Sequence, residues 1–358
     1  MSNNYQNMGK IHNFSAGPSI LSKETILGCI DGIKDFAGTS LSVLEVSHRG
    51  KEFVAIVDES KKIIKELLNI NDDYDIIFLG GGASLQFCMI PFNFLHTKAA
   101  YINTGTWSSN AIKEAKIFGE VLEIASSEDK NFNYIPKNIS IPTDADYLHF
   151  TSNNTIFGTQ FKEFPHTNLP LICDMSSDIL SRKINVSDFD IIYAGAQKNM
   201  GPAGVTVVII KKDYLVNAKT NIPTMMKYKI HVEKESMFNT PPVFPIFAMY
   251  QNLLWVQKLG GVDAMQKRAA IRADLLYQNI DNSNAFEGTV EKEDRSQMNA
   301  CFKLLDNTLE ENFLADCKSA GISGIKGHRS VGGFRASMYN ALPIESVEAL
   351  VNIMNKYK

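Results

Sequence analysis

Short apolar runs alternate with helical patterns along residues 54–210, and no other feature limits the possible folds as strongly. Residues 54–68 carry apolar side chains at near-helical spacing with lysine and glutamate between them, which predicts an amphipathic helix. Residues 75–79 are an apolar run that leads through a glycine turn into a second helical pattern. The alternation continues in strands predicted at 99–103 and 120–124, a helix predicted at 108–118, and apolar runs ending at Thr151, Asp174 and Ala194. This order predicts an α/β fold, with a mostly parallel sheet and helices on both faces.

The pattern changes after the apolar run 205–210. A proline-rich stretch at 240–245 is a predicted hinge, and helical patterns follow it from 246 to 280. A smaller α+β lobe is predicted from the segments 298–305, 309–320, 332–337 and 344–357. Because single cores rarely grow past about 250–300 residues, a chain of 358 residues is expected to form two lobes.

Composition and charge narrow the functional classes. A formal net charge of −3, with lysine and arginine spread along the chain, gives no electrostatic footprint for nucleic acid. The five cysteines are odd in number and contain no C-x-x-C pair, so neither a disulfide framework nor a metal site is indicated. No apolar signal segment is visible at the start, and the run 205–210 is too short to span a bilayer. We therefore expect a cytoplasmic protein with no membrane or nucleic-acid partner.

Asp174 ends the apolar run 169–173, and Lys198 follows the run 190–194. A lysine just past a buried strand can lose its proton by desolvation and form a Schiff base with an aldehyde such as pyridoxal phosphate. The pyridinium nitrogen of that coenzyme needs a carboxylate beside it, which Asp174 can supply. For an isolated pair, a turn-capping aspartate and a surface lysine would be the commoner interpretation. The neighbouring motifs favour the coenzyme.

The glycine turn Gly80–Ser84 leads into a predicted helix, where free backbone N–H groups can hold a phosphate. It lacks the last glycine of a dinucleotide fingerprint and the Gly-Lys-Ser/Thr ending of a Walker A loop. Taken alone, it could also be a simple tight turn.

Two further side chains follow predicted strands, where ligands collect in α/β sheets. Trp107 could stack on a pyridine ring, although tryptophan is more often a packing residue. Thr155 could reach the phenolic oxygen of the ring, although Asn and Ser clusters such as 152–154 are usually plain turns.

Histidine–arginine pairs occur twice, at His48-Arg49 and His328-Arg329, and Arg335 follows the second pair. The guanidinium fork binds two oxygens of a carboxylate or phosphate at once. One such pair would be ordinary surface, but the set suits a substrate that carries both anions.

Several blocks of the sequence resemble those of the phosphoserine aminotransferase family. Members of this family are class-V, pyridoxal-phosphate-dependent enzymes with the aspartate-aminotransferase fold type. The matching blocks are 12–18, 45–53, 194–199, 201–204, 236–242, 326–329 and 331–333, which cover the chain nearly end to end. The resemblance implies a large coenzyme-binding domain at 11–255, built on a mostly parallel, mixed seven-stranded sheet. It also implies a small C-terminal α+β domain at 256–358, against which residues 1–20 pack.

The resemblance also implies roles for the candidate coenzyme site. Lys198 would anchor the coenzyme and move the substrate proton, and Asp174 would pair with the ring nitrogen. The other implied coenzyme contacts are Trp107 on the ring face, Thr155 at the ring oxygen, Ala83, Ser84 and Gln197 at the phosphate, and Asn239 and Thr240 at the phosphate from the second subunit of a homodimer.

For the substrates, the resemblance gives Arg335 to the α-carboxylate. It gives His328 and Arg329 to the phosphate end, with His48 and Arg49 crossing from the partner subunit; Arg49 is also a candidate for the carboxylates of glutamate. The implied reaction is ping-pong transfer of an amino group from L-glutamate to 3-phosphohydroxypyruvate, which yields O-phospho-L-serine and 2-oxoglutarate in serine biosynthesis. Some members of the family also act in pyridoxine biosynthesis, on the phosphohydroxythreonine step, and the sequence leaves that activity open.

The chain departs from the family pattern at several points. It carries extra residues before Ile11, and it has Ala83-Ser84 where some relatives place an arginine. Asn154 stands where some relatives carry an acid, so the polarity around Thr155 is not fixed by the resemblance.

Four alternatives remain open at this point. A cysteine desulfurase needs a mobile nucleophilic cysteine, and no cysteine lies at 302–316 or from 318 onward. An alanine–glyoxylate type aminotransferase has no use for the paired histidines and arginines. A dinucleotide-dependent dehydrogenase lacks its fingerprint glycine, and a non-catalytic binding protein would not need Lys198, Asp174 and Arg335 together.

Overall fold

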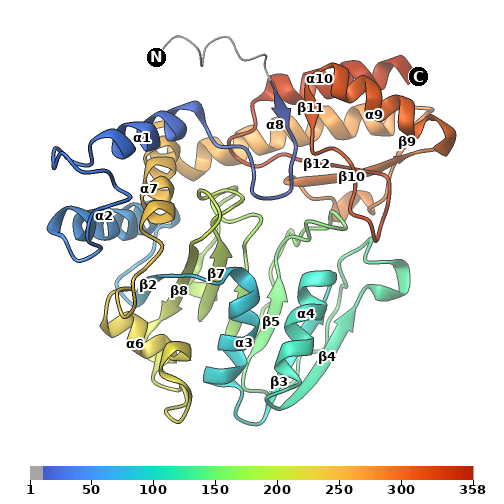
Figure 1. Ribbon diagram of the computed structural model, residues 1–358. Helices are drawn as coiled ribbons and strands as arrows, with labels where there is room; N and C mark the ends of the chain where they lie inside the picture. Colours follow the sequence, from blue (N-terminus) through green and yellow to red (C-terminus); the bar gives the residue numbers. More distant parts are fainter. Residues whose placement is uncertain (1–10, 358) are drawn as a thin grey trace.

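A seven-stranded mixed sheet forms the centre of the computed structural model, which describes residues 11–357 (Figure 1). The strands, in spatial order, are β2 (Tyr74–Leu79), β8 (Thr206–Lys211), β7 (Ile191–Gly195), β6 (Leu171–Asp174), β5 (Leu148–Thr151), β3 (Lys98–Asn103) and β4 (Glu120–Ser126). β8 runs antiparallel to both of its neighbours, and the remaining pairs are parallel. The predicted α/β fold with a mostly parallel sheet is confirmed.

Helices cover both faces of this sheet (Figure 1). They are α1 (Lys23–Lys34), α2 (Lys51–Leu68), α3 (Gly82–Phe94), α4 (Thr106–Ala115), α5 (Lys212–Leu215), α6 (Tyr228–Glu233) and α7 (Val243–Lys258). Strand residues alternate between the two faces, because side-chain direction reverses at each strand residue. Phe78 thus packs with α2 and α7 in one core, whereas Ile77 packs with α3 and α4 in the other.

A second group of elements lies above the carboxyl ends of the central strands in Figure 1. It contains α8 (Gly261–Asp281), β9 (Phe286–Gly288), β10 (Asn299–Leu304), α9 (Glu310–Ser319), β12 (Phe334–Ser337) and α10 (Ile344–Met354). β12, β10 and β9 form an antiparallel sheet in that order. Short 3-10 helices occur at Glu128–Lys130, Val186–Asp188, Thr224–Met226, Lys292–Asp294, Asn307–Leu309 and Asn355–Tyr357.

The beginning of the described chain joins this second group. β1 (His12–Asn13) pairs in parallel with β11 (Ile322–Ser323), and Phe14 lies in the same apolar core as α8 and α10. Residues 1–10, which belong to the segment expected to pack here, lie outside the described residues. The expected domain boundary at 255/256 falls in the last turn of α7 and stays a prediction, as does the hinge at 240–245. Of the helices in residues 11–357, none has both the length and the apolar character that a membrane span requires.

Helix α7 supports the turn that follows β7. The Asn252 amide of α7 donates a 3.0 Å hydrogen bond to the carbonyl of Asn199. A Cβ on Gly201 would lie 2.9 Å from the Cα of Met249, so glycine is needed for this close approach. The position of Lys198 therefore depends on how α7 is packed.

Helix α1 in turn packs against α7 through glycine. A Cβ on Gly32 would lie 2.3 Å from a ring atom of the buried Phe247, which makes an edge-to-face contact with Phe36. A Cβ on Gly28, one turn earlier, would meet the flexible end of Gln251 at 2.2 Å. The first contact is with a buried ring that is packed against Phe36, and the second is with the end of a flexible side chain.

We expect Gly32→Ala to lower the free energy of unfolding by about 1–3 kcal/mol, because overpacking forces the Phe247 ring to shift. Gly28→Ala is the matched control and should change it by less than about 1 kcal/mol, since alanine also favours the helix. Urea denaturation of both variants measures the difference. Equal losses would contradict the proposed distinction between a rigid and a flexible neighbour.

Candidate active site

A cavity of about 280 Å³ opens where β5, β6 and β7 end and the second sheet begins. Parallel strands direct their carboxyl ends to one edge of a sheet, so the loops that follow them converge there. Nine of the predicted site residues line this cavity: Ala83, Ser84, Trp107, Thr155, Asp174, Gln197, Lys198, His328 and Arg335.

Asp174 and Lys198 are brought to the same cavity by neighbouring strands. Asp174 is the last residue of β6, and Lys198 lies in the turn that leaves β7 at Gly195. The turn is fixed on both sides of the lysine: its N–H donates to the Ala196 carbonyl at 2.7 Å, and its carbonyl accepts from the Ser19 hydroxyl at 2.6 Å. The backbone of Lys198 is therefore held in place, and the residue lines the cavity.

Burial changes the acid–base behaviour of both groups. Desolvation lowers the pKa of the Lys198 amine to about 8, against the opposing attraction of the Asp174 charge, and the charge of Arg335 lowers it further. Desolvation raises the pKa of Asp174, while the Ser176 N–H, which donates to its carboxylate at 2.9 Å, and the charge of Lys198 act in the opposite direction. A fraction of the Lys198 amine is thus neutral and nucleophilic near neutral pH. The ionised form of the Asp174 carboxylate would be stabilised by a cationic partner.

The glycine turn begins α3 at the cavity. Gly81 and Gly82 have φ values of 87° and 65°, which favour glycine, and a Cβ on Gly81 would lie 2.6 Å from Leu85. Gly81 is the N-cap of α3, so the first N–H groups of the helix, including those of Ala83 and Ser84, have no partner within the helix. These N–H groups and the Ser84 hydroxyl can hold a phosphate.

Trp107 and Thr155 are joined directly, because the indole N–H donates to the threonine hydroxyl at 2.8 Å. This bond sets the indole at the cavity wall. Asn154 holds the loop from the other side through donations of 3.0 Å to the hydroxyls of Thr104 and Thr159. At this position the chain uses a neutral amide that is bonded at both its nitrogen and its oxygen.

Arg335, on β12, reaches the cavity from the second sheet. One guanidinium nitrogen donates to the Thr155 carbonyl at 3.0 Å. Its Nε is buried and has no hydrogen-bond partner among the described residues. A guanidinium held at one nitrogen retains donors for an anionic ligand.

His328 also lines the cavity, from a loop that precedes β12. Its Nδ1 lies 2.7 Å from the Ser330 hydroxyl, and its carbonyl accepts from the Gly332 N–H at 2.9 Å. Burial, followed by the charges of Arg335 and Arg329, lowers the pKa of His328. Negative charge at this end of the cavity would be stabilised by the same arginines.

Five predicted site residues do not line the cavity within one chain. They are His48, Arg49, Asn239, Thr240 and Arg329. His48 and Arg49 precede α2, and the His48 Nε2 is buried without a partner among the described residues. Asn239 lines a separate cavity with Gly80 and Leu85, and its amide donates to the Thr240 carbonyl at 3.1 Å.

The cavity also contains residues that were not predicted from the sequence. The most informative are Asn153, Ser176 and Ser177, which follow strands β5 and β6 just as Thr155 and Lys198 follow theirs. The strand-end rule could have identified them. Ala16 and Gly17 complete the wall from a loop far away in sequence.

The residues present fit a planar, phosphorylated aldehyde. The cavity provides an amine, a carboxylate, a flat indole and a helix N-terminus, and the buried Thr151 hydroxyl has no hydrogen-bond partner among the described residues. No group of three or more His, Cys, Asp or Glu side chains within residues 11–357 is placed to hold a metal ion. The arrangement therefore suits a coenzyme better than a metal.

Comparison with known proteins gives matches along nearly the whole chain. The aminotransferase class-V family model matches residues 11–350. The phosphoserine aminotransferase of Parabacteroides distasonis is 56% identical over 98% of this chain and 99% of its own. The solved phosphoserine aminotransferase of Bacillus circulans subsp. alkalophilus is 44% identical with a TM-score of 0.95, over 97% of this chain and 98% of its own. A pyridoxal-phosphate-bound phosphoserine aminotransferase from Trichomonas vaginalis is 38% identical with a TM-score of 0.92, over 97% of this chain and 100% of its own.

We expect the reaction of coenzyme-free protein with pyridoxal phosphate at Lys198 to accelerate with pH around a midpoint of about 8, because only the neutral amine attacks. Borohydride reduction and mass spectrometry of the labelled peptide measure the rate, and Lys198→Ala gives the background. In Asp174→Asn the midpoint should fall, because the charge that raises the pKa of Lys198 is removed. A midpoint near 10.5, or one that Asp174→Asn leaves unchanged, would contradict this account.

Proposed function

This chain belongs to the class-V aminotransferase family, and from that premise we propose that it transfers the amino group of L-glutamate to 3-phosphohydroxypyruvate. The products are 2-oxoglutarate and O-phospho-L-serine, and the coenzyme is pyridoxal phosphate. The observation that carries the proposal is the buried Lys198 amine beside Asp174, in a cavity that Arg335 closes from the second sheet. The three relatives compared above, which are 38–56% identical and match over nearly their full length, are phosphoserine aminotransferases. A dinucleotide-dependent dehydrogenase has no support from these matches.

Pyridoxal phosphate supplies an aldehyde that accepts the amino group and a ring that withdraws electrons from the substrate Cα. Lys198 would be its attachment point, Asp174 would hold the ring nitrogen, and Trp107 would pack against the ring. Thr155 would contact the ring oxygen. The N–H groups of Ala83 and Ser84, with the Gln197 side chain, would hold the coenzyme phosphate.

The chain's own groups perform the proton transfer and the orientation of substrate. Lys198 Nζ takes the proton from the substrate Cα, because burial keeps part of its population neutral near pH 8. Arg335 binds the substrate α-carboxylate with the donors that Thr155 leaves free.

The distal phosphate of one substrate and the side-chain carboxylate of the other occupy the same anion-binding subsite. His328 lies at that end of the cavity, and Arg329 follows it in the chain. Both substrates carry an anion there, so a single cationic subsite serves each half of the reaction in turn.

A homodimer with shared sites completes this subsite through His48 and Arg49, and the coenzyme-phosphate site through Asn239 and Thr240. In one chain His48, Arg49, Asn239 and Thr240 lie outside the cavity, although their residue types suit phosphate and carboxylate. The segment that carries His48 also exposes Leu41 and Leu44, by 48% and 63%. Exposed apolar side chains beside basic residues that lie outside the cavity of their own chain are typical of a surface that a second subunit covers.

The proposal includes the division into a coenzyme domain at 11–255 and a small domain at 256–358, and a cytoplasmic location. The location is supported by the five free cysteines, four of which are buried.

We expect the reconstituted protein to show a visible absorption band that L-glutamate removes and 3-phosphohydroxypyruvate restores. Hydroxypyruvate, which lacks the phosphate, should restore the band far more slowly at equal concentration. Lys198→Ala should lower turnover by at least about 100-fold, the usual contribution of a general base. A band that glutamate removes but the phosphorylated oxo acid does not restore would reject the substrate, and no band would reject the coenzyme.

The shared site is tested by mixing inactive variants. If Arg49 serves the partner's Lys198, unfolding and refolding an equal mixture of Arg49→Ala and Lys198→Ala restores about a quarter of wild-type activity. The reason is that half of the randomly formed dimers then hold one intact site of two. Arg335→Ala mixed with Lys198→Ala is the control and should restore none, because both residues line one cavity of one chain. No recovery in the first mixture would contradict a shared site.

A further inference from the structure

Two buried asparagines connect the coenzyme loops to the second sheet. Asn153, in the loop after β5, and Asn299, at the start of β10, are 1% and 0% exposed. The Asn153 amide donates to the Asn299 side-chain oxygen at 2.8 Å. This bond joins two parts of the chain that only tertiary folding brings together.

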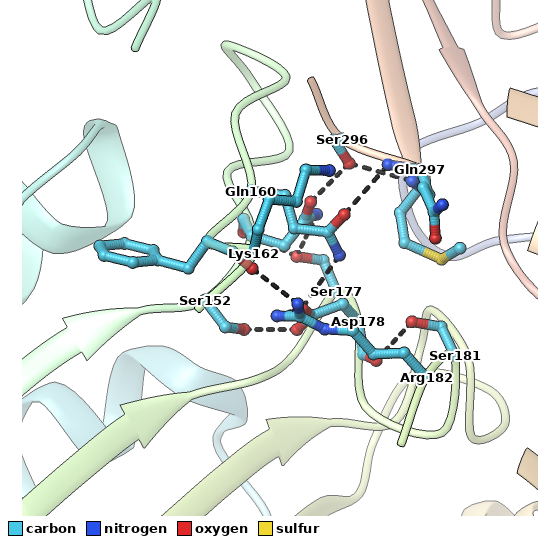
Figure 2. Close-up of polar contacts among 12 residues, drawn as sticks. Ser152, Gln160, Lys162, Ser177, Asp178, Ser181, Arg182, Ser296 and Gln297 are labelled. Carbon is cyan, nitrogen blue, oxygen red and sulfur yellow. Dashed lines mark hydrogen bonds and ion pairs between the residues drawn. The ribbon is translucent and has the colours of Figure 1, made fainter. Parts of the chain in front are cut away.

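Asn153 is bonded at every polar atom of its side chain. Its amide also donates to the Ser177 hydroxyl at 2.8 Å, and that hydroxyl donates to the Asn153 carbonyl at 2.8 Å. Its side-chain oxygen accepts from the Ser296 hydroxyl. Figure 2 shows Ser177 and Ser296, from the two parts of the molecule, in one polar cluster.

Asn299 continues the connection into β12. Its amide donates to the Ser337 hydroxyl at 3.0 Å and to the Tyr339 hydroxyl at 3.1 Å. Asn299 is also the strand partner of Ser337, and Cys301 is the strand partner of Arg335. The amide therefore fixes β12 two residues away from the arginine that faces the cavity.

These bonds form a closed circuit. Asn153 is bonded to Asn299, Asn299 to Ser337, and β12 leads from Ser337 to Arg335. Arg335 donates to the Thr155 carbonyl at 3.0 Å, and the chain returns from Thr155 to Asn153. A closed circuit fixes the distance and direction of the guanidinium relative to the loop that holds the ring contacts, whereas the Arg335–Thr155 bond alone leaves a hinge.

We propose that Asn153 and Asn299 are positioning residues, which set Arg335 at the place where the substrate α-carboxylate binds. This rests on the proposed function, because it takes Arg335 as the carboxylate-binding residue. Neither asparagine needs to touch substrate for this effect. A displacement of about 1 Å at a binding group can lower the rate by about 100-fold.

The expected result is a loss of substrate binding that is separate from any loss of stability. Asn299→Ala should raise the KM for L-glutamate about tenfold. The dissociation constant of pyridoxal phosphate should stay within about twofold of wild type, because the substitution does not change Lys198 or the N-terminus of helix α3. In an Arg335→Ala background the same substitution should have no further effect on KM, since it acts through that arginine. Steady-state kinetics, coenzyme titration by absorbance and thermal unfolding provide the three measurements.

Asn93→Ala is the matched control. Asn93 is fully buried in α3 and donates 2.7 Å bonds to the carbonyls of Met89 and Met226, outside the cavity. It should lower the melting temperature as Asn299→Ala does and leave KM unchanged. If Asn299→Ala does not fold, Ser337→Ala opens the same circuit at one bond and should raise KM about threefold.

The outcomes separate the positioning role from the role of Arg335. If Arg335→Ala raises KM but Asn299→Ala only lowers the melting temperature or the coenzyme affinity, the positioning role is wrong and the proposed function stands. If Arg335→Ala itself leaves KM unchanged, the assignment of the carboxylate to Arg335 is wrong, and the positioning role fails with it. Equal effects of Asn299→Ala in both backgrounds would also overturn the proposal.

Discussion

The parallel register of β5, β6 and β7 is the constraint on which the site depends. Thr151 pairs with Asp174, and Asp174 pairs with Tyr193, so the three strands end at one edge of the sheet. Parallel pairing requires long crossover connections, which is why these neighbours in space are far apart in sequence. The loops that leave this edge carry Thr155, the Ser176–Asp178 turn and Lys198. Helix α7 and the glycine contacts behind it keep that edge in place.

The electrostatics of the cavity follow from burial at this edge. Desolvation lowers the pKa of Lys198 and raises that of Asp174, so both groups are pushed toward their neutral forms while each attracts the charged form of the other. A protonated pyridine ring beside Asp174 would offset the desolvation penalty of the buried carboxylate. Asp174 would then have the ring as its counter-ion in place of Lys198. The same pair can therefore bind the ring and supply a base, because burial controls both pKa values.

Much of the fold could be predicted because the sheet is buried on both faces and its strands are near-continuous apolar runs. The run ending at Asp174 is one such strand. The glycine turn before α3 could be predicted from its three consecutive glycines. The site was predicted as far as its residues follow strands or belong to family motifs. His48 and Asn239 do not line the cavity of one chain, and the proposed homodimer would place their ligands in the second subunit. Asn153 and Asn299 carry no motif, because a buried amide pair is defined by geometry and not by spacing.

The use of neutral amides between the two parts of the molecule fits the electrostatic demands of the cavity. Another uncompensated charge near Lys198 and Asp174 would shift both of their pKa values, because interactions are weakly screened in a buried site. Asp178 is a further carboxylate nearby, and its charge raises the pKa of both groups. That charge is partly offset, because Arg182 forms an ion pair with it at 3.0 Å and Ser152 and Gln160 donate to it, as Figure 2 shows. Amides give directional bonds without a net charge, so they can fix Arg335 while the acid–base balance of the reacting groups stays as burial sets it.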